Sequence, residues 1–362
     1  MSLAVDEVYM AQALKLAEKG CYTTDPNPRV GCVLVRDGLV IAEGWHNEAG
    51  HAHAEVDALS KLGDATDSTA YVTLEPCSHT GRTGPCCEAL ISAGVQRVVI
   101  AMQDPNPLVA GQGIKTMQDA GLIIECGVLQ QQAEVLNKGF IKRMTSGLPF
   151  VVSKLAMSLD GRTAMASGES KWITSAQARQ DVQKLRAGSS AILTGINTVL
   201  ADDPSMNVRL DEAVTQPVRV VLDSRLQMPV TAKMLSLQGQ TWVLTSSQDE
   251  SKKIKLEAVG CQVFQVKAFQ DQLDLLAVMT FLAEQQINTV LVEAGAVLNG
   301  ALLERNLVDE WLVYMAPCIL GDKGRGLFNL PSMNTMADKK QLKLSSFRQV
   351  GPDLRLTFNI NK

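Results

Sequence analysis

The sequence lacks an excess of basic charge. Lys and Arg number 34 against 38 Asp and Glu, which gives a formal net charge of −4, and the sequence pI is about 5.7. Proteins that bind the phosphate backbone of DNA or RNA usually present a cationic surface. We therefore expect no nucleic-acid partner and favour a small-molecule substrate.

Long apolar runs and a signal peptide are also missing. No stretch approaches the roughly 20 apolar residues that span a membrane. Residues 1–20 carry no basic leader, and Asp6, Glu7 and Lys15 interrupt their apolar positions, which predicts an amphipathic helix over 5–19. We expect no membrane association.

Dense cysteine spacing is the third absence. Eight cysteines are scattered over 362 residues, which is not the framework of a small disulfide-stabilised secreted domain. Together with the missing leader, this scatter predicts a cytoplasmic protein.

The length of the chain predicts two domains, because 362 residues exceed one ordinary hydrophobic core. Residues 145–149 (Thr-Ser-Gly-Leu-Pro) form the turn-rich boundary nearest the middle. We place the first domain at 1–147 and the second at 148–362.

Both halves alternate strands with helices, which predicts parallel pairing and α/β domains. The first half is expected to be a three-layer α/β/α domain. It opens with a hairpin that turns at Asp37-Gly38, and one long helix over 130–144 is expected to precede the boundary. Further strands are predicted at 70–74, 97–102, 122–126, 150–156, 190–195, 218–223, 241–246, 289–294 and 310–317.

The stretch from Gly50 to Cys87 carries the densest chemistry of the chain. It contains His53 and Glu55 in a His-Ala-Glu triplet, then Cys77 and Cys86, each preceded by proline. One imidazole and two thiolates suit a Zn²⁺ ion that keeps its fourth position open for water. Because Glu55 lies two residues beyond His53, it can reach that water without binding the metal, an arrangement typical of hydrolysis.

This order matches the H-x-E and P-C-x-x-C pattern of zinc-dependent base deaminases. The match has one departure, since eight residues separate Cys77 from Cys86 where the general pattern has two. A purely structural zinc is the alternative, with His51 or His79 as a fourth ligand.

Two further positions have both a functional and a structural interpretation. Asn27 lies between two prolines, so its amide is held stiffly and could read a base edge or a sugar hydroxyl, or could simply belong to a turn. Near Gly295 a strand ends and a helix begins within two residues, which favours phosphate binding. Glycine there can equally serve close packing, and Gly295 with Gly300 does not make a complete dinucleotide motif.

The motifs together resemble one family, the bifunctional deaminase–reductases of riboflavin biosynthesis. The matching segments are DPNPRVGCVLV, HAEVDAL, TLEPCSHTGRTGPC, AMQDPNP, KLAMSLDGRTAMASGESKWITS, TVLADDPSMNVR and VEAG. The resemblance covers nearly the whole chain and includes the long Cys77–Cys86 spacing. It implies a cytidine-deaminase-like first domain and a dihydrofolate-reductase-like second domain.

The resemblance also implies two consecutive reactions. The first is zinc-hydroxide hydrolysis of the 2-amino group of 2,5-diamino-6-(5-phosphoribosylamino)pyrimidin-4-one. The second is reduction of the ribosyl side chain to ribityl with NADPH. One Zn²⁺ per chain would be bound by His53, Cys77 and Cys86, with Glu55 as the proton shuttle.

For the second domain the resemblance implies cofactor and substrate positions. NADPH would contact Ala156, Trp172, Thr198, Asp202, Ser224, Gly295, Ala296, Val297, Leu298, Asn299, Gly300 and Ala301. Substrate would contact Ser170, Arg186, Met206, Arg209 and Glu293, with Lys154 and, in the first domain, Asn27 as further candidates.

Two departures from the family pattern lie in the second half, Ala294 in place of a second glycine and Met206-Asn207 in place of Leu-Thr. Two rival interpretations remain: a nucleoside or tRNA deaminase fused to an unrelated reductase, and a structural zinc module docked to the second half. The acidic pI and the long cysteine spacing count against the first rival. We expect a homo-oligomer, with a dimer favoured, and assign no role to Cys87.

Overall fold

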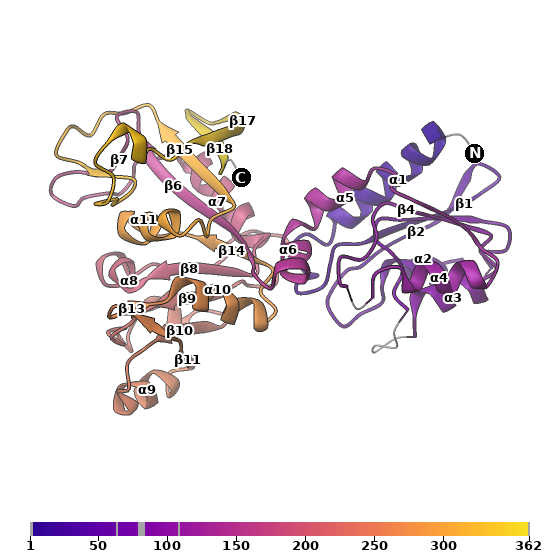
Figure 1. The fold of residues 1–362 in the computed structure, drawn as a ribbon, viewed down its shortest axis with the longest axis horizontal. Coiled ribbons are helices and arrows are strands. Elements are labelled where there is room, and N and C mark those ends of the chain that lie inside the picture. The colour runs from indigo at the N-terminus through magenta and orange to yellow at the C-terminus, as the bar shows by residue number, and fades with distance from the viewer. Residues whose placement is uncertain (1–2, 63, 79–83, 108, 361–362) are drawn as a thin grey trace. The chain divides into compact units, whose positions relative to one another are not determined.

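The computed structural model describes residues 3–62, 64–78, 84–107 and 109–360. Internal contacts divide the chain into two compact units, Met1–Gly147 and Leu148–Lys362, called unit 1 and unit 2 below. Each unit is built on its own sheet (Figure 1).

Unit 1 is built on a five-stranded sheet in the order β2-β1-β3-β4-β5. The predicted hairpin is confirmed, with Asp37 and Gly38 at positive φ of 52° and 78° in its turn. The strands β3, β4 and β5 are parallel to one another. The bounds are β1 Gly31–Arg36, β2 Leu39–Trp45, β3 Thr69–Val72, β4 Arg97–Ile100 and β5 Ile123–Cys126.

Helices cover both faces of this sheet, which makes the predicted three layers: α1 and α5 lie on one face and α2, α3 and α4 on the other (Figure 1). Two glycines allow helix backbones to touch the strands. A Cβ at Gly31 would lie 2.0 Å from the Ala13 carbonyl oxygen of α1, and one at Gly44 would lie 2.2 Å from the Ala54 carbonyl oxygen of α2. The helix bounds are α1 Leu3–Glu18, α2 Ala54–Ser60, α3 Cys86–Ser92, α4 Gln112–Asp119, α5 Gln130–Leu136 and α6 Lys138–Ser146.

The single helix expected over 130–144 is wrong, because the structure has two helices that meet at Asn137. The backbone there leaves the helical region, with φ −113° and ψ 20°. The Asn137 side chain accepts from the Arg29 N–H at 2.8 Å and donates to the Arg29 carbonyl at 2.9 Å. A helical periodicity does not reveal this pairing, because Arg29 is distant in sequence.

Unit 2 contains a nine-stranded sheet in the order β11-β10-β9-β8-β14-β6-β15-β18-β17. The strands from β11 to β15 pair in parallel, and β18 and β17 add an antiparallel edge. The bounds are β6 Phe150–Ser158, β8 Ala191–Gly195, β9 Val218–Leu222, β10 Thr241–Thr245, β11 Cys261–Gln265, β14 Thr289–Val292, β15 Glu310–Ala316, β17 Leu342–Val350 and β18 Asp353–Ile360.

Successive residues of the central strands enter different cores, as the two-residue period of a strand requires. Leu193 and Val220 face the core closed by α10 and α11, whereas Ile192 and Val221 face the core closed by α8 and α9. The sheet is therefore covered on both sides. The helices are α7 Ala176–Ala187, α8 Ile196–Asp202, α9 Glu250–Glu257, α10 Leu275–Glu284 and α11 Ala296–Glu304, with short strands β7 Arg162–Ala164, β12 Ala268–Phe269, β13 Gln272–Leu273 and β16 Arg325–Gly326 and 3-10 turns η1 Lys233–Ser236 and η2 Met336–Asp338.

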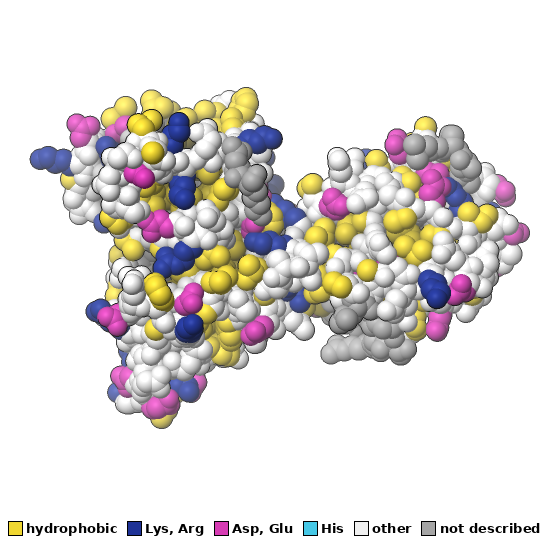
Figure 2. Space-filling view, in the orientation of Figure 1, with side chains coloured by type: hydrophobic (Ala, Val, Ile, Leu, Met, Phe, Trp, Pro, Cys, Tyr) yellow, Lys and Arg dark blue, Asp and Glu magenta, His cyan; other side chains and the backbone are white. Residues whose placement is uncertain are grey.

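The charge distribution and the length of the helices can be read from the described residues. On the face shown in Figure 2, the described Lys and Arg side chains are interspersed with Asp and Glu and form no continuous basic surface. Within the described ranges, no helix combines the length and the apolar character needed to cross a membrane.

The division at residue 147 leads to the first prediction. Because each unit has its own buried core, we expect fragments 1–147 and 148–362 to fold separately. Each fragment should unfold cooperatively on heating, monitored by circular dichroism, and should keep the amide hydrogen-exchange protection that it has in the whole chain. Insolubility of both fragments would contradict independent folding.

Candidate active sites

Three soft ligands converge at one edge of unit 1. His53 is the N-cap residue of α2, Cys86 is the first residue of α3, and Cys77 follows β3. The His53 Nδ1 atom lies 3.2 Å from Cys86 Sγ and 3.6 Å from Cys77 Sγ. These side chains form a cluster whose ligand atoms all lie within 4.8 Å of one another, a group able to hold a metal ion.

Local hydrogen bonds change the pKa values of the two cysteine thiols in this cluster. The Cys86 backbone N–H, at the start of α3, donates to Cys77 Sγ at 3.3 Å. The pKa of Cys77 is lowered despite its burial, mainly because the Cys86 thiol donates to its sulfur, and further because of His53 and this N–H. The pKa of Cys86 is raised, because its thiol donates to Cys77 and is buried. These contacts favour the thiolate form of Cys77, and thiolate is the metal-binding form.

Glu55 lies in the first turn of α2 and is 3% exposed. Burial raises its pKa to about 7. A carboxyl group with this pKa gains and loses a proton near neutral pH, which is the property that a general acid and base needs.

Asn27 is held by a histidine that sequence reasoning missed. The His46 Nδ1 atom lies 3.0 Å from the Ala52 carbonyl oxygen, so Nδ1 carries the proton, and Nε2 accepts from Asn27 Nδ2 at 3.1 Å. His46 is buried, and burial lowers its pKa. Its ring meets the His53 ring edge-on, with centroids 5.3 Å apart. The scarcity of histidine, four in the chain, is the one signal that could have drawn attention to His46.

The other candidates for metal binding lie elsewhere. His51 is exposed, and its Nδ1 atom lies 3.8 Å from Glu48. Cys87 is buried next to Cys86 but does not belong to the cluster. His79 lies outside the described residues.

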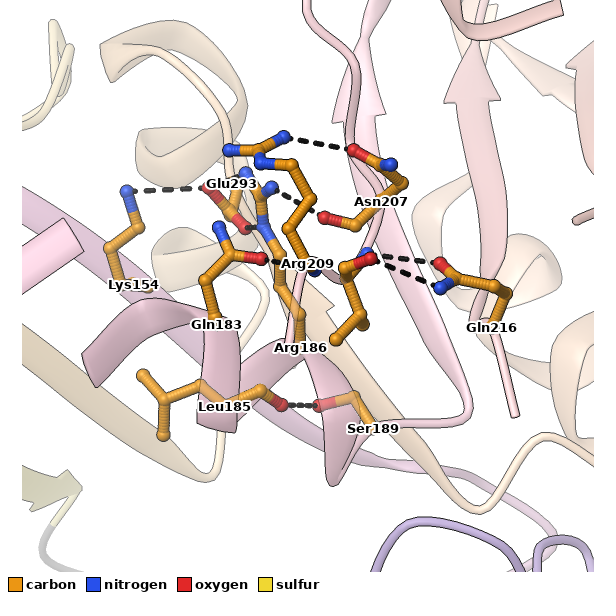
Figure 3. Close-up of polar contacts among 10 residues, drawn as sticks. Lys154, Gln183, Leu185, Arg186, Ser189, Asn207, Arg209, Gln216 and Glu293 are labelled. Carbon is orange, nitrogen blue, oxygen red and sulfur yellow. Dashed lines mark hydrogen bonds and ion pairs between the residues drawn. The ribbon is translucent and has the colours of Figure 1, made fainter. Parts of the chain in front are cut away.

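A second cluster lies where β14 ends beside the middle of β6 in unit 2 (Figure 3). Glu293, directly after β14, accepts from Arg186 of α7 at 2.6 Å (Nε) and 3.0 Å (Nη2). Lys154 of β6 lies 3.4 Å from the same carboxylate. Arg209 approaches from an irregular segment, and its Nη1 donates to Asn207 Oδ1 at 2.9 Å.

The charges of this second cluster do not cancel. Burial alone would raise the pKa of Glu293, but Arg186 and Lys154 outweigh it and lower the pKa to about 2. Burial lowers the pKa of Arg209, and the neighbouring Arg186 charge lowers it further. Arg186 and Lys154 pair with the Glu293 carboxylate and Arg209 lies near enough to feel the charges of Arg186 and Glu293, so the formal charges of these four groups sum to +2.

Two predicted substrate residues lie outside the direct contacts of this cluster. Met206 is 2% exposed and packs in a hydrophobic core of unit 2, with φ at +46°. Ser170 is half-buried in the connection between β7 and α7.

The predicted cofactor residues follow neighbouring strands. Ser224 comes after β9, Thr198 and Asp202 lie on α8 after β8, and Ala156 lies on β6. The turn at Gly295 follows β14, and the α11 residue Leu298 approaches to 3.7 Å of a Cβ built on Gly195. Since β9, β8, β14 and β6 are consecutive parallel strands, these groups share one edge of the sheet, where ligands of open α/β sheets bind.

The remaining cofactor candidates differ in exposure. Trp172 is 71% exposed, with the Arg179 guanidinium 4.5 Å from its ring centroid, and Asp202 lies 3.6 Å from Lys171. Ala296, Leu298 and Ala301 of α11 are half-buried and Val297 is exposed.

Asn299 and Gly300 are buried inside the fold. Asn299 donates to the Ala294 and Gly295 carbonyls at 2.8 and 3.2 Å and accepts from Ser153 at 2.6 Å. A Cβ at Gly300 would lie 2.1 Å from the Asn329 carbonyl oxygen. Both residues therefore shape the turn at Gly295 from within.

Comparison with known proteins identifies the family. The cytidine and deoxycytidylate deaminase zinc-binding region matches residues 3–102, and the RibD C-terminal domain matches residues 149–356. The riboflavin biosynthesis protein RibD of Escherichia coli K12 is 52% identical over 364 residues, which cover 97% of this chain and 98% of that protein. The chain belongs to the RibD family.

Solved RibD structures have the same fold over the whole chain. Acinetobacter baumannii RibD superposes with a TM-score of 0.93 at 46% identity, with 100% of both chains covered. A Thermotoga maritima diaminohydroxyphosphoribosylaminopyrimidine deaminase/5-amino-6-(5-phosphoribosylamino)uracil reductase gives 0.88 at 31% identity, with 99% of both chains covered. The predicted family and fold classes are confirmed: the protein is a bifunctional deaminase and reductase of riboflavin biosynthesis with a zinc-binding deaminase region.

The ligand cluster leads to the second prediction. Three protein ligands should hold one Zn²⁺ per RibD chain, so Cys77→Ser and Cys86→Ser should each lose most of the metal. Elemental analysis of the purified proteins measures this loss. Cys87→Ser is the matched control, because Cys87 is buried beside the cluster without joining it, and it should retain zinc. Full zinc content in both Cys77→Ser and Cys86→Ser would refute the ligand assignment.

Proposed function

We propose that unit 1 removes the 2-amino group of 2,5-diamino-6-(5-phosphoribosylamino)pyrimidin-4-one by hydrolysis and that unit 2 then reduces the ribosyl side chain to ribityl with NADPH. The observation that carries this proposal is the His53–Cys77–Cys86 cluster with the buried Glu55 beside it. The name of the Thermotoga maritima relative contains the same two activities.

The donor set of unit 1 fits zinc. One imidazole nitrogen and two cysteine sulfurs match the ligands of catalytic zinc sites, which leave a position for water. Bound there, zinc supplies Lewis acidity that makes water a nucleophile near neutral pH.

Glu55 moves the protons of the deamination. The carboxylate takes a proton from the attacking water and delivers it to the pyrimidine ring nitrogen. It then carries the second proton to the departing amine, which leaves as ammonia. The raised pKa of about 7 favours this role, because neither protonation state of the carboxyl group is strongly preferred at neutral pH.

Asn27 orients the pyrimidine substrate. Its Nδ2 donates to His46, which directs Oδ1 away from that histidine and makes it available to accept from an amino group or a ribose hydroxyl. The hydrogen bond to Ala52 sets the His46 tautomer, because it places the proton on Nδ1. Nε2 is then an acceptor, so the Asn27 amide turns its nitrogen to His46 and its oxygen to the substrate.

The cluster of unit 2 binds the 5′-phosphate of the ribosyl chain. A phosphate monoester carries a charge of about −1.5 to −2 at pH 7, which matches the net charge of +2 around Glu293. Arg186 and Arg209 form charge-assisted hydrogen bonds with the phosphate oxygens. Lys154 and Glu293 contact the ribosyl chain, and Ser170 and the Met206 backbone complete the binding site.

The residues after β9, β8 and β14, together with Ala156 of β6, would hold NADPH, which would supply the hydride. The turn at Gly295 suits its phosphates, because Asn299 holds the Ala294 and Gly295 carbonyls inward and α11 begins there. Exposed Trp172 is available to cover the cofactor. The contacts come from Ala156, Trp172, Thr198, Asp202, Ser224 and Gly295 to Ala301.

The cellular location and the oligomeric state remain predictions. We propose a cytoplasmic location and a homodimer, both of which await fractionation of cells and sedimentation of the purified protein.

Glu55→Gln is the third prediction. The amide cannot relay protons, so ammonia release should fall on the order of a hundredfold or more, whereas the zinc content should not change. Reduction of substrate that has already been deaminated should proceed at the normal rate, which controls for misfolding. Normal ammonia release by this variant would remove Glu55 from the mechanism.

The fourth prediction tests the phosphate assignment. Arg209→Ala and Arg186→Ala should lower kcat/KM of the reductase about ten- to a hundredfold for the phosphorylated substrate, because a charge-assisted hydrogen bond contributes about 1.5–3 kcal/mol. The dephosphorylated analogue should lose far less, and the KM for NADPH should change little. Arg209→Ala is the sharper test, because Arg186→Ala also leaves Glu293 without its closest partner.

Exposed Arg305→Ala serves as the control and should behave like the wild type with both compounds. Equal losses on the two compounds in Arg209→Ala would mean that Arg209 does not read the phosphate.

A further inference from the structure

The segment that carries Arg209 has no regular secondary structure. Residues 203–210 lie between α8 and β9 outside any helix or strand. Backbone N–H and C=O groups without a helix or sheet partner need other hydrogen bonds. In this segment, side chains provide them.

Two glutamines hold the segment from opposite sides (Figure 3). Gln183 of α7 accepts from the Arg209 N–H at 2.9 Å. Gln216 accepts from the Val208 N–H at 2.9 Å and donates to the Val208 carbonyl at 3.1 Å, as a neighbouring strand would. Arg186 adds a third contact, since its Nη1 donates to the Asn207 carbonyl at 3.0 Å.

Gln183 and Arg186 are three residues apart on α7, so they lie on the same face of the helix. Gln183 is 7% exposed. One helix face therefore binds both the Glu293 carboxylate and the segment that carries Arg209.

This arrangement holds two like charges together. Arg209 is exposed and lies close enough to Arg186 for the two guanidinium charges to repel. A free segment would relieve the repulsion by moving Arg209 away from Arg186. The hydrogen bonds from the glutamines oppose that movement, and an anion placed between the guanidinium groups would favour the held arrangement.

We propose that Gln183 and Gln216 are positioning residues that hold the 207–209 backbone so that Arg209 faces a phosphate beside Arg186. They thereby set the preference of the reductase for a phosphorylated substrate. This inference rests on the proposed assignment of the 5′-phosphate to Arg186 and Arg209.

The test compares Gln183→Leu and Gln216→Leu with wild type by steady-state reduction of the phosphorylated substrate and its dephosphorylated analogue. Each variant should lose about tenfold in kcat/KM for the phosphorylated compound, the scale of a lost hydrogen bond, and little for the analogue. The KM for NADPH should not change. Gln180→Leu is the matched control, because Gln180 is exposed on the same helix, and it should keep the wild-type preference.

A double-mutant cycle separates positioning from general stability. If Gln183 acts through Arg209, Gln183→Leu should have almost no further effect on the phosphorylated substrate in an Arg209→Ala background. If Gln183→Leu does not fold, Gln183→Asn replaces it. This variant keeps an amide that is too short to reach the Arg209 N–H.

The outcomes distinguish the phosphate assignment from the positioning role of the glutamines. Equal losses on both compounds in Arg209→Ala would overturn the phosphate assignment itself. The positioning role alone would be overturned if Arg209→Ala lost activity selectively on the phosphorylated substrate but the glutamine variants did not. The glutamine variants would then lose equally on both compounds, or their losses would add to that of Arg209→Ala.

Discussion

The common direction of neighbouring strands determines where both sites lie. In unit 1, β2 and β3 are each antiparallel to β1, and β4 and β5 run parallel to β3. Four strands therefore end at one edge of the sheet, and the ligands His53, Cys77 and Cys86 follow β2 and β3 there. In unit 2 the parallel pairing of β14 with β6 sets Val292 opposite Ser153, so Glu293, just past the end of β14, lies beside Lys154 in the middle of the longer β6. The position of both clusters depends on where parallel strands end.

Two buried glutamates show how surroundings decide the role of one side-chain type. Burial dominates at Glu55 and raises its pKa to about 7, which suits a group that exchanges protons. Arg186 and Lys154 outweigh burial at Glu293 and lower its pKa to about 2. Glu293 therefore stays ionised and pairs with Arg186 and Lys154. The same type of carboxyl group has a pKa near neutral in one unit and is a fixed charge in the other.

Local patterns predicted much of this fold. The hairpin at Asp37-Gly38 and the strand–helix alternation were readable, because turn chemistry and periodicity act over a few residues. The predicted helix over 130–144 was wrong where a distant partner, Arg29, binds the Asn137 side chain. The antiparallel strands β17 and β18 were also missed. Residues of β17 are largely exposed and carry little apolar alternation, whereas β18 has apolar residues at every second position from Leu354 to Ile360, a signal that could have found it.

The sequence by itself determined the chemistry of this protein: the ligand types His53, Cys77 and Cys86, the nearby carboxyl group of Glu55, and the cationic residues of unit 2. These follow from residue identity and short spacing, and the family resemblance rests on the same motifs. The tertiary structure alone decided which groups meet. His46 orients Asn27, and the glutamines of unit 2 hold the backbone of Arg209, through contacts between segments that are separate in the chain. Hydrogen-bond geometry of this kind depends on packing in three dimensions, which a linear pattern does not encode.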